Sequence, residues 1–79
     1  MVKSEIIEKV NTFLIDELEI DPASIRPDAN LKDDLDIDSL DFVDIAVLVE
    51  RTFDFTIKAE DLMNVHTISE FYDYIETKA

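Results

Sequence analysis

The chain contains no glycine among its 79 residues and only two prolines. Tight β-hairpin turns depend on backbone angles that glycine adopts freely and most other residues adopt with strain. A chain without glycine is therefore poorly suited to a sheet built of hairpins. Because the composition is otherwise globular, with 47% hydrophobic and 34% charged residues, the missing glycine predicts an all-α fold.

Length and cysteine content limit the chain to one small domain. We expect residues 1–79 to form a single domain, because chains usually divide only when they are much longer. A core of this size supplies only about 3–5 kcal/mol of net stability. The chain has no cysteine that could add a disulfide, so the fold must depend on packing alone.

The net charge is unusually negative. Twenty acidic residues against seven basic ones give −13, whereas a magnitude of about 2–8 suits a small soluble domain. Such a surface repels phosphate backbones and anionic lipids, so we expect no nucleic-acid partner, no membrane insertion, and basic protein patches as partners. The sequence has no apolar run long enough for a membrane span and no signal-peptide pattern, which indicates a cytoplasmic protein. We also expect a monomer.

Hydrophobic periodicity predicts amphipathic helices near both ends of the chain. Between Ser4 and Leu18, apolar residues recur every three or four positions, with charged residues between them. Near the other end, Thr67 and Glu70 have the spacing of a capping box, in which threonine accepts a bond from the glutamate amide and the glutamate side chain reaches back. The helix that follows has on one face Ile68, Phe71, Tyr72 and Ile75.

A long loop is predicted after the first helix. Pro22 opens one short turn through Ser24, and Pro27 prevents that turn from growing into a helix. The loop therefore runs to about Asp38. Loops of this length are uncommon in compact domains unless they are functional or held down by their own apolar side chains. Here the expected anchors are Ile25, Leu31 and Leu35.

A second helix is predicted from Ser39 to about Phe53, because Asp38 and Ser39 can accept bonds from the free amides of a helix start. Its apolar residues wrap most of its surface, so it is either buried on most sides or keeps one apolar flank for a partner. An extended crossing segment and a short helix at Ala59–Met63 follow. The sequence thus predicts a small four-helix bundle with three longer helices, one short third helix, and a long loop between helices 1 and 2.

Residues that could perform catalysis or hold a metal are scarce. His66 is the one histidine and cysteine is absent, so a catalytic triad would depend on a residue that we interpret as lying at a helix boundary on the surface. Aspartates alternate from position 34 to 38 as at the start of a calcium-binding EF-hand loop. The sixth position of that loop is Ser39 where glycine is needed, and the twelfth is Ile45 instead of glutamate. We expect neither an enzyme nor a specific metal site.

Acidic and apolar residues form neighbouring ridges on the second helix. Aspartates spaced by three share one ridge, and three apolar residues lie on the ridge beside it. The acidic ridge is Asp38, Asp41 and Asp44, and the apolar ridge is Leu40, Val43 and Val47. Together they form a docking surface. Ser39, where this helix begins, is either a simple helix cap or a favourable point for a phosphate, because helix amides favour anions.

These residues resemble the acyl carrier proteins of fatty-acid and polyketide synthesis. The motif is Asp38-Ser39-Leu40-Asp41, preceded by Asp33-Asp34-Leu35 and followed by an apolar, acidic helix that ends at Phe53. Length, acidity, helix order, the Pro27-Asp28-Ala29 segment and Tyr74-Ile75 also fit. The resemblance therefore covers nearly the whole chain.

The resemblance implies that Ser39 receives a 4′-phosphopantetheine arm from coenzyme A, attached by a separate phosphopantetheinyl transferase. The thiol of the arm would carry acyl groups as thioesters between enzymes of fatty-acid synthesis or a specialised, polyketide-like pathway, and the chain itself would catalyse nothing. The implied partners are the transferase and the acyl-transfer, condensing and reducing enzymes, engaged through basic patches. The family's partner-recognition positions are matched by Asp38, Leu40, Asp41, Val43, Asp44, Val47 and Glu50. Its acyl-pocket positions are matched by Leu31, Val49, Ile57, Leu62, Val65, Phe71 and Tyr74.

Several positions depart from the family pattern. Asp36 and the isoleucine after it stand where glycine and a small residue are usual, and Asp54 replaces another glycine, so we expect altered loop geometry. Phe42 replaces a small or polar residue and Arg51 an acidic one, which predicts a docking surface changed at its middle and end. Phe71 is larger than the usual pocket residue, which predicts a shortened or re-routed acyl cavity.

Two other hypotheses stay open. A peptidyl or aminoacyl carrier would have the same architecture, although such domains are less acidic. An unmodified acidic interaction module that occupies a basic groove would not need the Ser39 hydroxyl, whereas a carrier depends on it.

Overall fold

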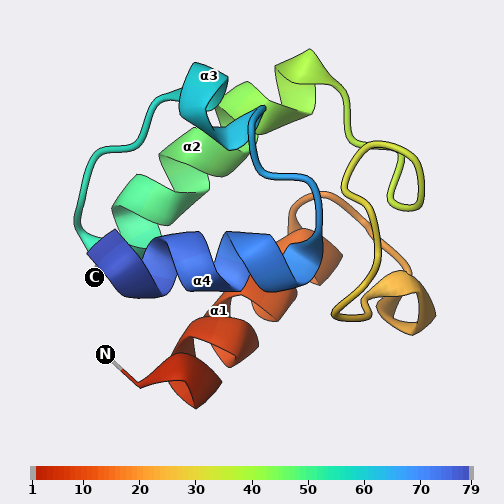
Figure 1. Cartoon of the computed structure of the whole chain (residues 1–79), viewed down its shortest axis with the longest axis horizontal. Coiled ribbons are helices and arrows are strands. Elements are labelled where there is room, and N and C mark those ends of the chain that lie inside the picture. Colours follow the sequence, from red (N-terminus) through yellow and green to blue (C-terminus); the bar gives the residue numbers. More distant parts are fainter. Residues whose placement is uncertain (1, 79) are drawn as a thin grey trace.

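Four α-helices and one short 3-10 helix are found in residues 2–78, the part of the chain that the computed structural model describes (Figure 1). The elements are α1 (Lys3–Asp16), η1 (Pro22–Ser24), α2 (Ser39–Phe53), α3 (Ala59–Leu62) and α4 (Ile68–Lys78). In these residues the only β-type pairing is one isolated bridge. The all-α prediction, the helix order and the short third helix are confirmed.

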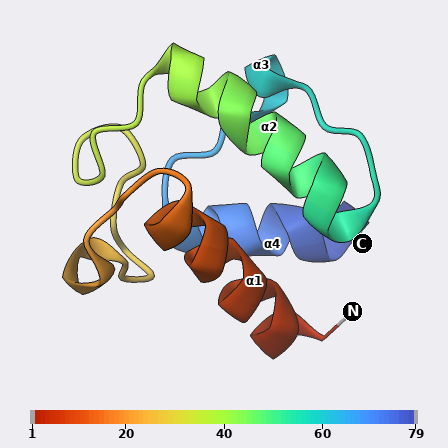
Figure 2. The same cartoon turned by 180° about the vertical axis from the view of Figure 1, so that it is seen from behind.

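The helices surround one hydrophobic core. Helix α4 packs against α1, α3 packs against α2, and α1 also contacts α2. Figures 1 and 2 show the long loop between α1 and α2 running along one side of the molecule, away from the end of α4. The core takes side chains from all four helices and also from the connecting segments, which contribute Ala29, Leu31, Leu35, Ile37, Ile57 and Val65.

Helix α1 ends at Asp16, two residues earlier than the periodicity predicts. Leu18 and Ile20 lie beyond the helix end yet still pack against the core, so their side chains extend the helical pattern without helical backbone. Glu19 between them has a left-handed backbone with φ of 56°, which turns the chain away from the helix. Helix α3 ends at Leu62, one residue before the predicted end.

The α1–α2 loop is held down from two sides. Leu31 and Leu35 are buried and Ile25 is partly buried against the core, which confirms them as the predicted anchors. The loop is also hydrogen-bonded to the start of α4. The Leu31 amide donates to the His66 carbonyl at 2.8 Å, and the Ile68 amide donates to the Ala29 carbonyl at 3.0 Å. These two bonds flank the isolated bridge between Asn30 and Thr67. The sequence did not predict this connection.

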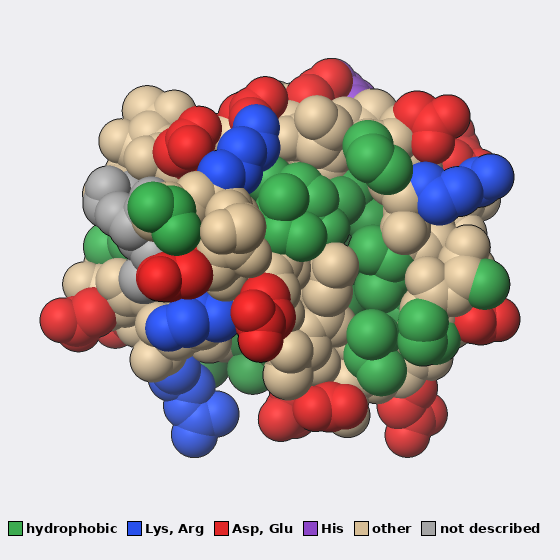
Figure 3. All heavy atoms as spheres, turned by 90° about the horizontal axis from the view of Figure 1, so that it is seen from below, with side chains coloured by type: hydrophobic (Ala, Val, Ile, Leu, Met, Phe, Trp, Pro, Cys, Tyr) green, Lys and Arg blue, Asp and Glu red, His purple; other side chains and the backbone are tan. Residues whose placement is uncertain are grey.

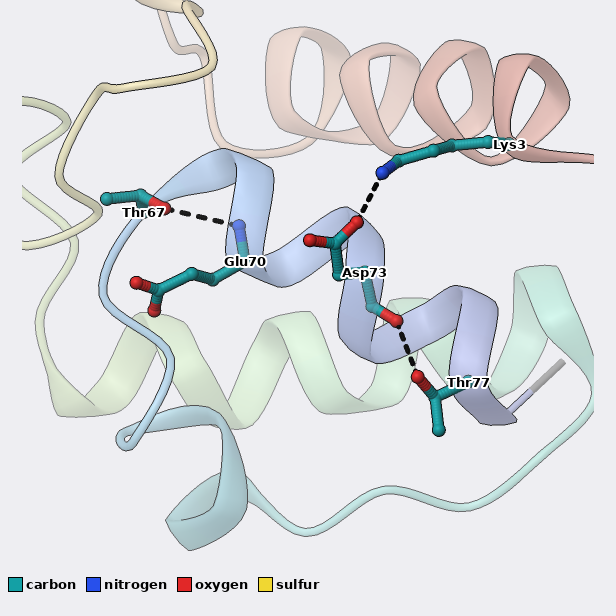
Figure 4. Close-up of polar contacts among 5 residues, drawn as sticks. All are labelled: Lys3, Thr67, Glu70, Asp73 and Thr77. Atoms are coloured by element: carbon teal, nitrogen blue, oxygen red, sulfur yellow. Dashed lines mark hydrogen bonds and ion pairs between the residues drawn. The ribbon is translucent and has the colours of Figure 1, made fainter.

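Polar contacts fix the start and the middle of α4 (Figure 4). The Thr67 hydroxyl accepts a bond from the Glu70 amide at 3.2 Å, as predicted. The Glu70 carboxylate reaches back to the amide of His66, one residue before Thr67, at 3.0 Å. His66 lies exposed beside the start of the helix, as interpreted from the sequence. Further along α4, Asp73 accepts a bond from Lys3 of α1, and this bond raises the pKa of the Lys3 ammonium.

Three acidic residues have the left-handed backbone that glycine adopts without strain. Glu19, Asp36 and Asp54 have φ of 56°, 57° and 61°. Asp36 and Asp54 are the two aspartates that stand where the family pattern has glycine. In these turns the Cβ atom of each residue crowds the backbone, which strains it. Aspartate tolerates the left-handed conformation better than most residues.

Replacing Asp54 with glycine is expected to raise the free energy of unfolding by about 0.5–1 kcal/mol. The relief of left-handed strain, roughly 1–2 kcal/mol, exceeds the entropic cost of glycine, roughly 0.5–1 kcal/mol. Urea denaturation of Asp54→Gly measures the change. Asp54→Ala is the matched control, because it removes the same charge but keeps the Cβ atom. If alanine stabilised the chain as much as glycine, charge repulsion and not backbone strain would be the cause.

Candidate functional site

The start of α2 is capped by two aspartates. Asp38 has an extended backbone, and its carboxylate accepts a hydrogen bond from the Asp41 amide at 3.0 Å. In return the Asp41 carboxylate accepts one from the Asp38 amide at 3.2 Å, which completes a capping box. Asp38 is thus the cap, and Ser39 is the first residue of the helix. Within residues 2–78 the Ser39 side chain makes no hydrogen bond, and it is exposed. Its hydroxyl is free to react.

A depression of about 300 Å³ adjoins Ser39. It lies where the α1–α2 loop, the first turn of α2 and the end of α3 meet, and its lining residues are Lys32, Ile37, Asp38, Ser39, Phe42 and Met63. Three of these side chains are apolar, one is basic and one is acidic. The Ser39 hydroxyl therefore adjoins a hollow whose lining carries one positive charge, one negative charge and three apolar side chains.

The outer face of α2 presents the predicted docking residues together. Leu40, Val43 and Val47 are 76%, 50% and 50% exposed. Of the two arrangements that the sequence allowed, α2 therefore has the one in which an apolar flank lies on the surface. The acidic members of the predicted set are exposed as well, apart from Asp41, which is half-buried. The acidic excess extends beyond α2, since Figure 3 shows acidic side chains around much of the edge of another face.

The predicted change at the middle of this surface is wrong. Phe42 is fully buried, because it belongs to the stripe of α2 that faces the core together with Ile45 and Val49. It therefore cannot alter what a partner meets on the outer face. Arg51 is exposed, as the prediction for the end of the surface requires, and it lines a second depression of about 230 Å³ with Glu17 and Asp44 among its neighbours.

The predicted acyl-pocket residues come together inside the core. Six of them are buried and come from the loop, α2, α3, α4 and the segments around α3, and Tyr74 is half-buried. The Lys78 ammonium lies over the Tyr74 ring, 5.8 Å from its centre. Phe71 is only 1% exposed and therefore occupies core volume. That these seven residues line an acyl cavity stays a prediction.

Sequence reasoning missed the residues that shape the loop before Ser39. The Asn30 side chain accepts bonds from the Lys32 and Asp33 amides, both at 2.9 Å, and the Asp34 carboxylate accepts one from the Asn30 amide at 2.7 Å. An asparagine side chain often accepts a hydrogen bond from the backbone amide two residues later. Asn30 was therefore a recognisable sequence signal for this turn. Met63 was missed because it reaches the depression from a distant part of the sequence.

Neither a metal cluster nor a membrane-spanning helix is found in residues 2–78. In the described part of the chain, no three or more acidic or histidine side chains are grouped so as to hold a metal ion. Across residues 2–78, every helix is too short or too polar to cross a membrane.

A small helical bundle that presents a free serine hydroxyl beside a hollow has the features of a carrier domain. Comparison with known proteins defines which kind: the family profile for the phosphopantetheine attachment site matches residues 8–75, and the chain belongs to this family.

Similar curated proteins are acyl carrier proteins. The one from Thermosynechococcus vestitus is 36% identical over 78 residues, covering 99% of this chain and 96% of the relative. The one from Petrotoga mobilis is 36% identical over 78 residues, covering 99% and 92%. The one from Amoebophilus asiaticus is 36% identical over 75 residues, covering 95% and 94%. The role of the chain is that of a carrier that shuttles acyl groups, with phosphopantetheine as its cofactor.

The residues at the start of α2 fit this cofactor. Phosphopantetheine needs one nucleophilic hydroxyl for its phosphate and space beside it for an arm that combines methyl and methylene groups with two amides and a hydroxyl. The exposed Ser39 hydroxyl and the hollow beside it, in which Met63 is the most exposed apolar side chain, meet both needs. When bound, the group supplies a terminal thiol, which a chain without cysteine lacks.

Proposed function

We propose that Ser39 is the residue that bears the phosphopantetheine arm. The observation that carries this proposal is that Asp38 and Asp41 supply the helix cap, which leaves the Ser39 hydroxyl exposed and without a hydrogen-bond partner in the described chain. A serine needed for capping would lose its bond on modification, whereas this one loses nothing. The chain then carries acyl groups as thioesters on the arm and catalyses none of the reactions itself.

The outer face of α2 is proposed as the recognition surface for the enzymes. It combines the exposed apolar ridge of Leu40, Val43 and Val47 with the carboxylates beside it. A partner would bring a basic patch to the carboxylates and an apolar side chain to the ridge, so association should be fast and sensitive to salt. The residues assigned to this surface are Asp38, Leu40, Asp41, Val43, Asp44, Val47 and Glu50.

The partners of this surface would be a phosphopantetheinyl transferase and the enzymes that load, extend and reduce the acyl group. We assign the carrier to fatty-acid synthesis or a related specialised pathway. The monomeric state, the cytoplasmic location and the single-domain organisation stay predictions from the sequence.

Mass mapping is expected to place the arm on one tryptic fragment. Cleavage after Lys32 and Arg51 releases residues 33–51, in which Ser39 is the only serine, threonine or tyrosine. After incubation with coenzyme A, magnesium and a broad-specificity transferase, the intact chain should gain one phosphopantetheine, and the gain should lie on this fragment. A gain on any other fragment, or none on a folded sample that began unmodified, would overturn the assignment of Ser39.

A further inference from the structure

The arm brings a negative charge to a site that is already acidic. Ser39 lies between Asp38 and Asp41, and the segment from 33 to 38 holds four aspartates. The phosphate of the arm, once joined to serine, remains a singly charged phosphodiester at neutral pH. Like charges at such spacing repel, so the root of the arm is disfavoured unless a cation lies close by.

Lys32 is the cation in the right place. It lines the same depression as Ser39 and is the only basic residue that does so. Its backbone is fixed, because its amide donates to the Asn30 side chain at 2.9 Å. The depression is therefore bordered by a serine hydroxyl on α2 and by a lysine whose position in the loop is held.

The Lys32 ammonium is also available. The ion pairs found in residues 2–78 involve Lys3 and His66, so Lys32 pairs with none of the aspartates that follow it in sequence. Two of the other four lysines have defined contacts: Lys3 bonds Asp73, and Lys78 lies over the Tyr74 ring. A lysine among carboxylates that pairs with none of them can turn to a new anion without breaking a contact.

We propose that Lys32 binds the phosphate of the arm and steadies the root of the arm against the apolar side of the depression. This inference rests on the proposed attachment at Ser39. Lys32 acts as a positioning residue: it touches the phosphate and not the thiol or the acyl group. It also offsets the one negative charge that modification adds, while the site as a whole stays acidic.

A thermodynamic cycle tests this role without any measurement of activity. The melting temperature is measured for the parent and for Lys32→Gln, each without and with the arm. Attachment of the arm is expected to lower the melting temperature of Lys32→Gln by about 2–4 °C more than that of the parent, as befits an exposed charge pair in a domain of this size. Lys9→Gln on α1 makes the same charge change away from the depression and should behave like the parent.

Further measurements separate the possible outcomes. At about 1 M salt, where the screening length is about 3 Å, the difference should disappear. Lys32→Arg keeps the charge and should restore the parent behaviour. If the arm shifted the melting temperature equally in the parent, Lys32→Gln and Lys9→Gln, the role of Lys32 would be refuted while attachment at Ser39 stood. If fragment 33–51 of the parent gained no mass, the attachment site itself would be wrong.

Discussion

Replacing Ser39 with alanine is expected to abolish phosphopantetheine transfer to below detection, while leaving the fold intact. The Ser39 hydroxyl is the group that we propose receives the phosphate, and residues 33–51 contain no other side-chain hydroxyl. The stability should change by no more than about 0.5 kcal/mol, because Ser39 is exposed and the cap belongs to its neighbours. Intact mass after incubation with the transferase, together with urea denaturation, measures both effects.

Two variants make this experiment decisive. Ser4→Ala removes a serine from the first turn of α1 and should gain the full arm. Asp38→Ala removes the cap and keeps the hydroxyl, so it should lose about 1 kcal/mol of stability. Because Asp38 also belongs to the proposed recognition surface, modification of this variant should be slower, but the arm that it gains should lie on the fragment that contains Ser39. Full mass gain by Ser39→Ala would show that another hydroxyl carries the arm. A Ser39→Ala variant that failed to fold would contradict the cap assignment.

Replacing Phe42 with alanine is expected to unfold most of the protein. Phe42 is fully buried, and truncation of a buried phenylalanine costs about 3–5 kcal/mol. That loss is as large as the net stability of about 3–5 kcal/mol expected for a domain of this length. Far-ultraviolet circular dichroism at 25 °C and urea denaturation should therefore show a mostly unfolded chain.

Leu40→Ala is the matched control for Phe42→Ala. Leu40 lies two residues earlier on the same helix but is 76% exposed, so its truncation should cost less than about 0.5 kcal/mol. Phe42→Leu keeps most of the apolar volume and should lose much less stability than Phe42→Ala. If Phe42→Ala and Leu40→Ala were equally stable, the inward position of Phe42 would be wrong.

Helix α2 shows both the strength and the limit of sequence analysis. Its start and end were predicted, because aspartates able to cap a helix precede Ser39 and the apolar pattern stops near Phe53. Its orientation was only partly predicted. The neighbouring aspartates indicate that Leu40 and Val43 face outward, but apolar residues cover most of the circumference, so the pattern alone does not show that Phe42 faces inward. Contacts with the other helices decide which stripe is buried.

The site was predictable where its chemistry is local and missed where it is not. Ser39 and the acidic ridge follow from neighbouring residues on one helix. The depression beside Ser39 joins Lys32 in the loop to Met63 at the end of α3, and no pattern within either segment indicates that they meet. The left-handed turn at Glu19 was missed because glutamate carries no preference for that backbone, whereas glycine would have signalled it.

The hydrogen bonds between the α1–α2 loop and the start of α4 determine when the loop before Ser39 reaches its final structure during synthesis. Ala29 and Leu31 exchange these bonds with Ile68 and His66, which leave the ribosome later. Domains complete their folding only when all of their mutually dependent segments are available. The loop that leads to Ser39 therefore lacks its hydrogen bonds to His66 and Ile68 until the start of α4 has been made. The emergence of His66 and Ile68 from the ribosome, and not that of Ser39, is the event that completes the surroundings of Ser39.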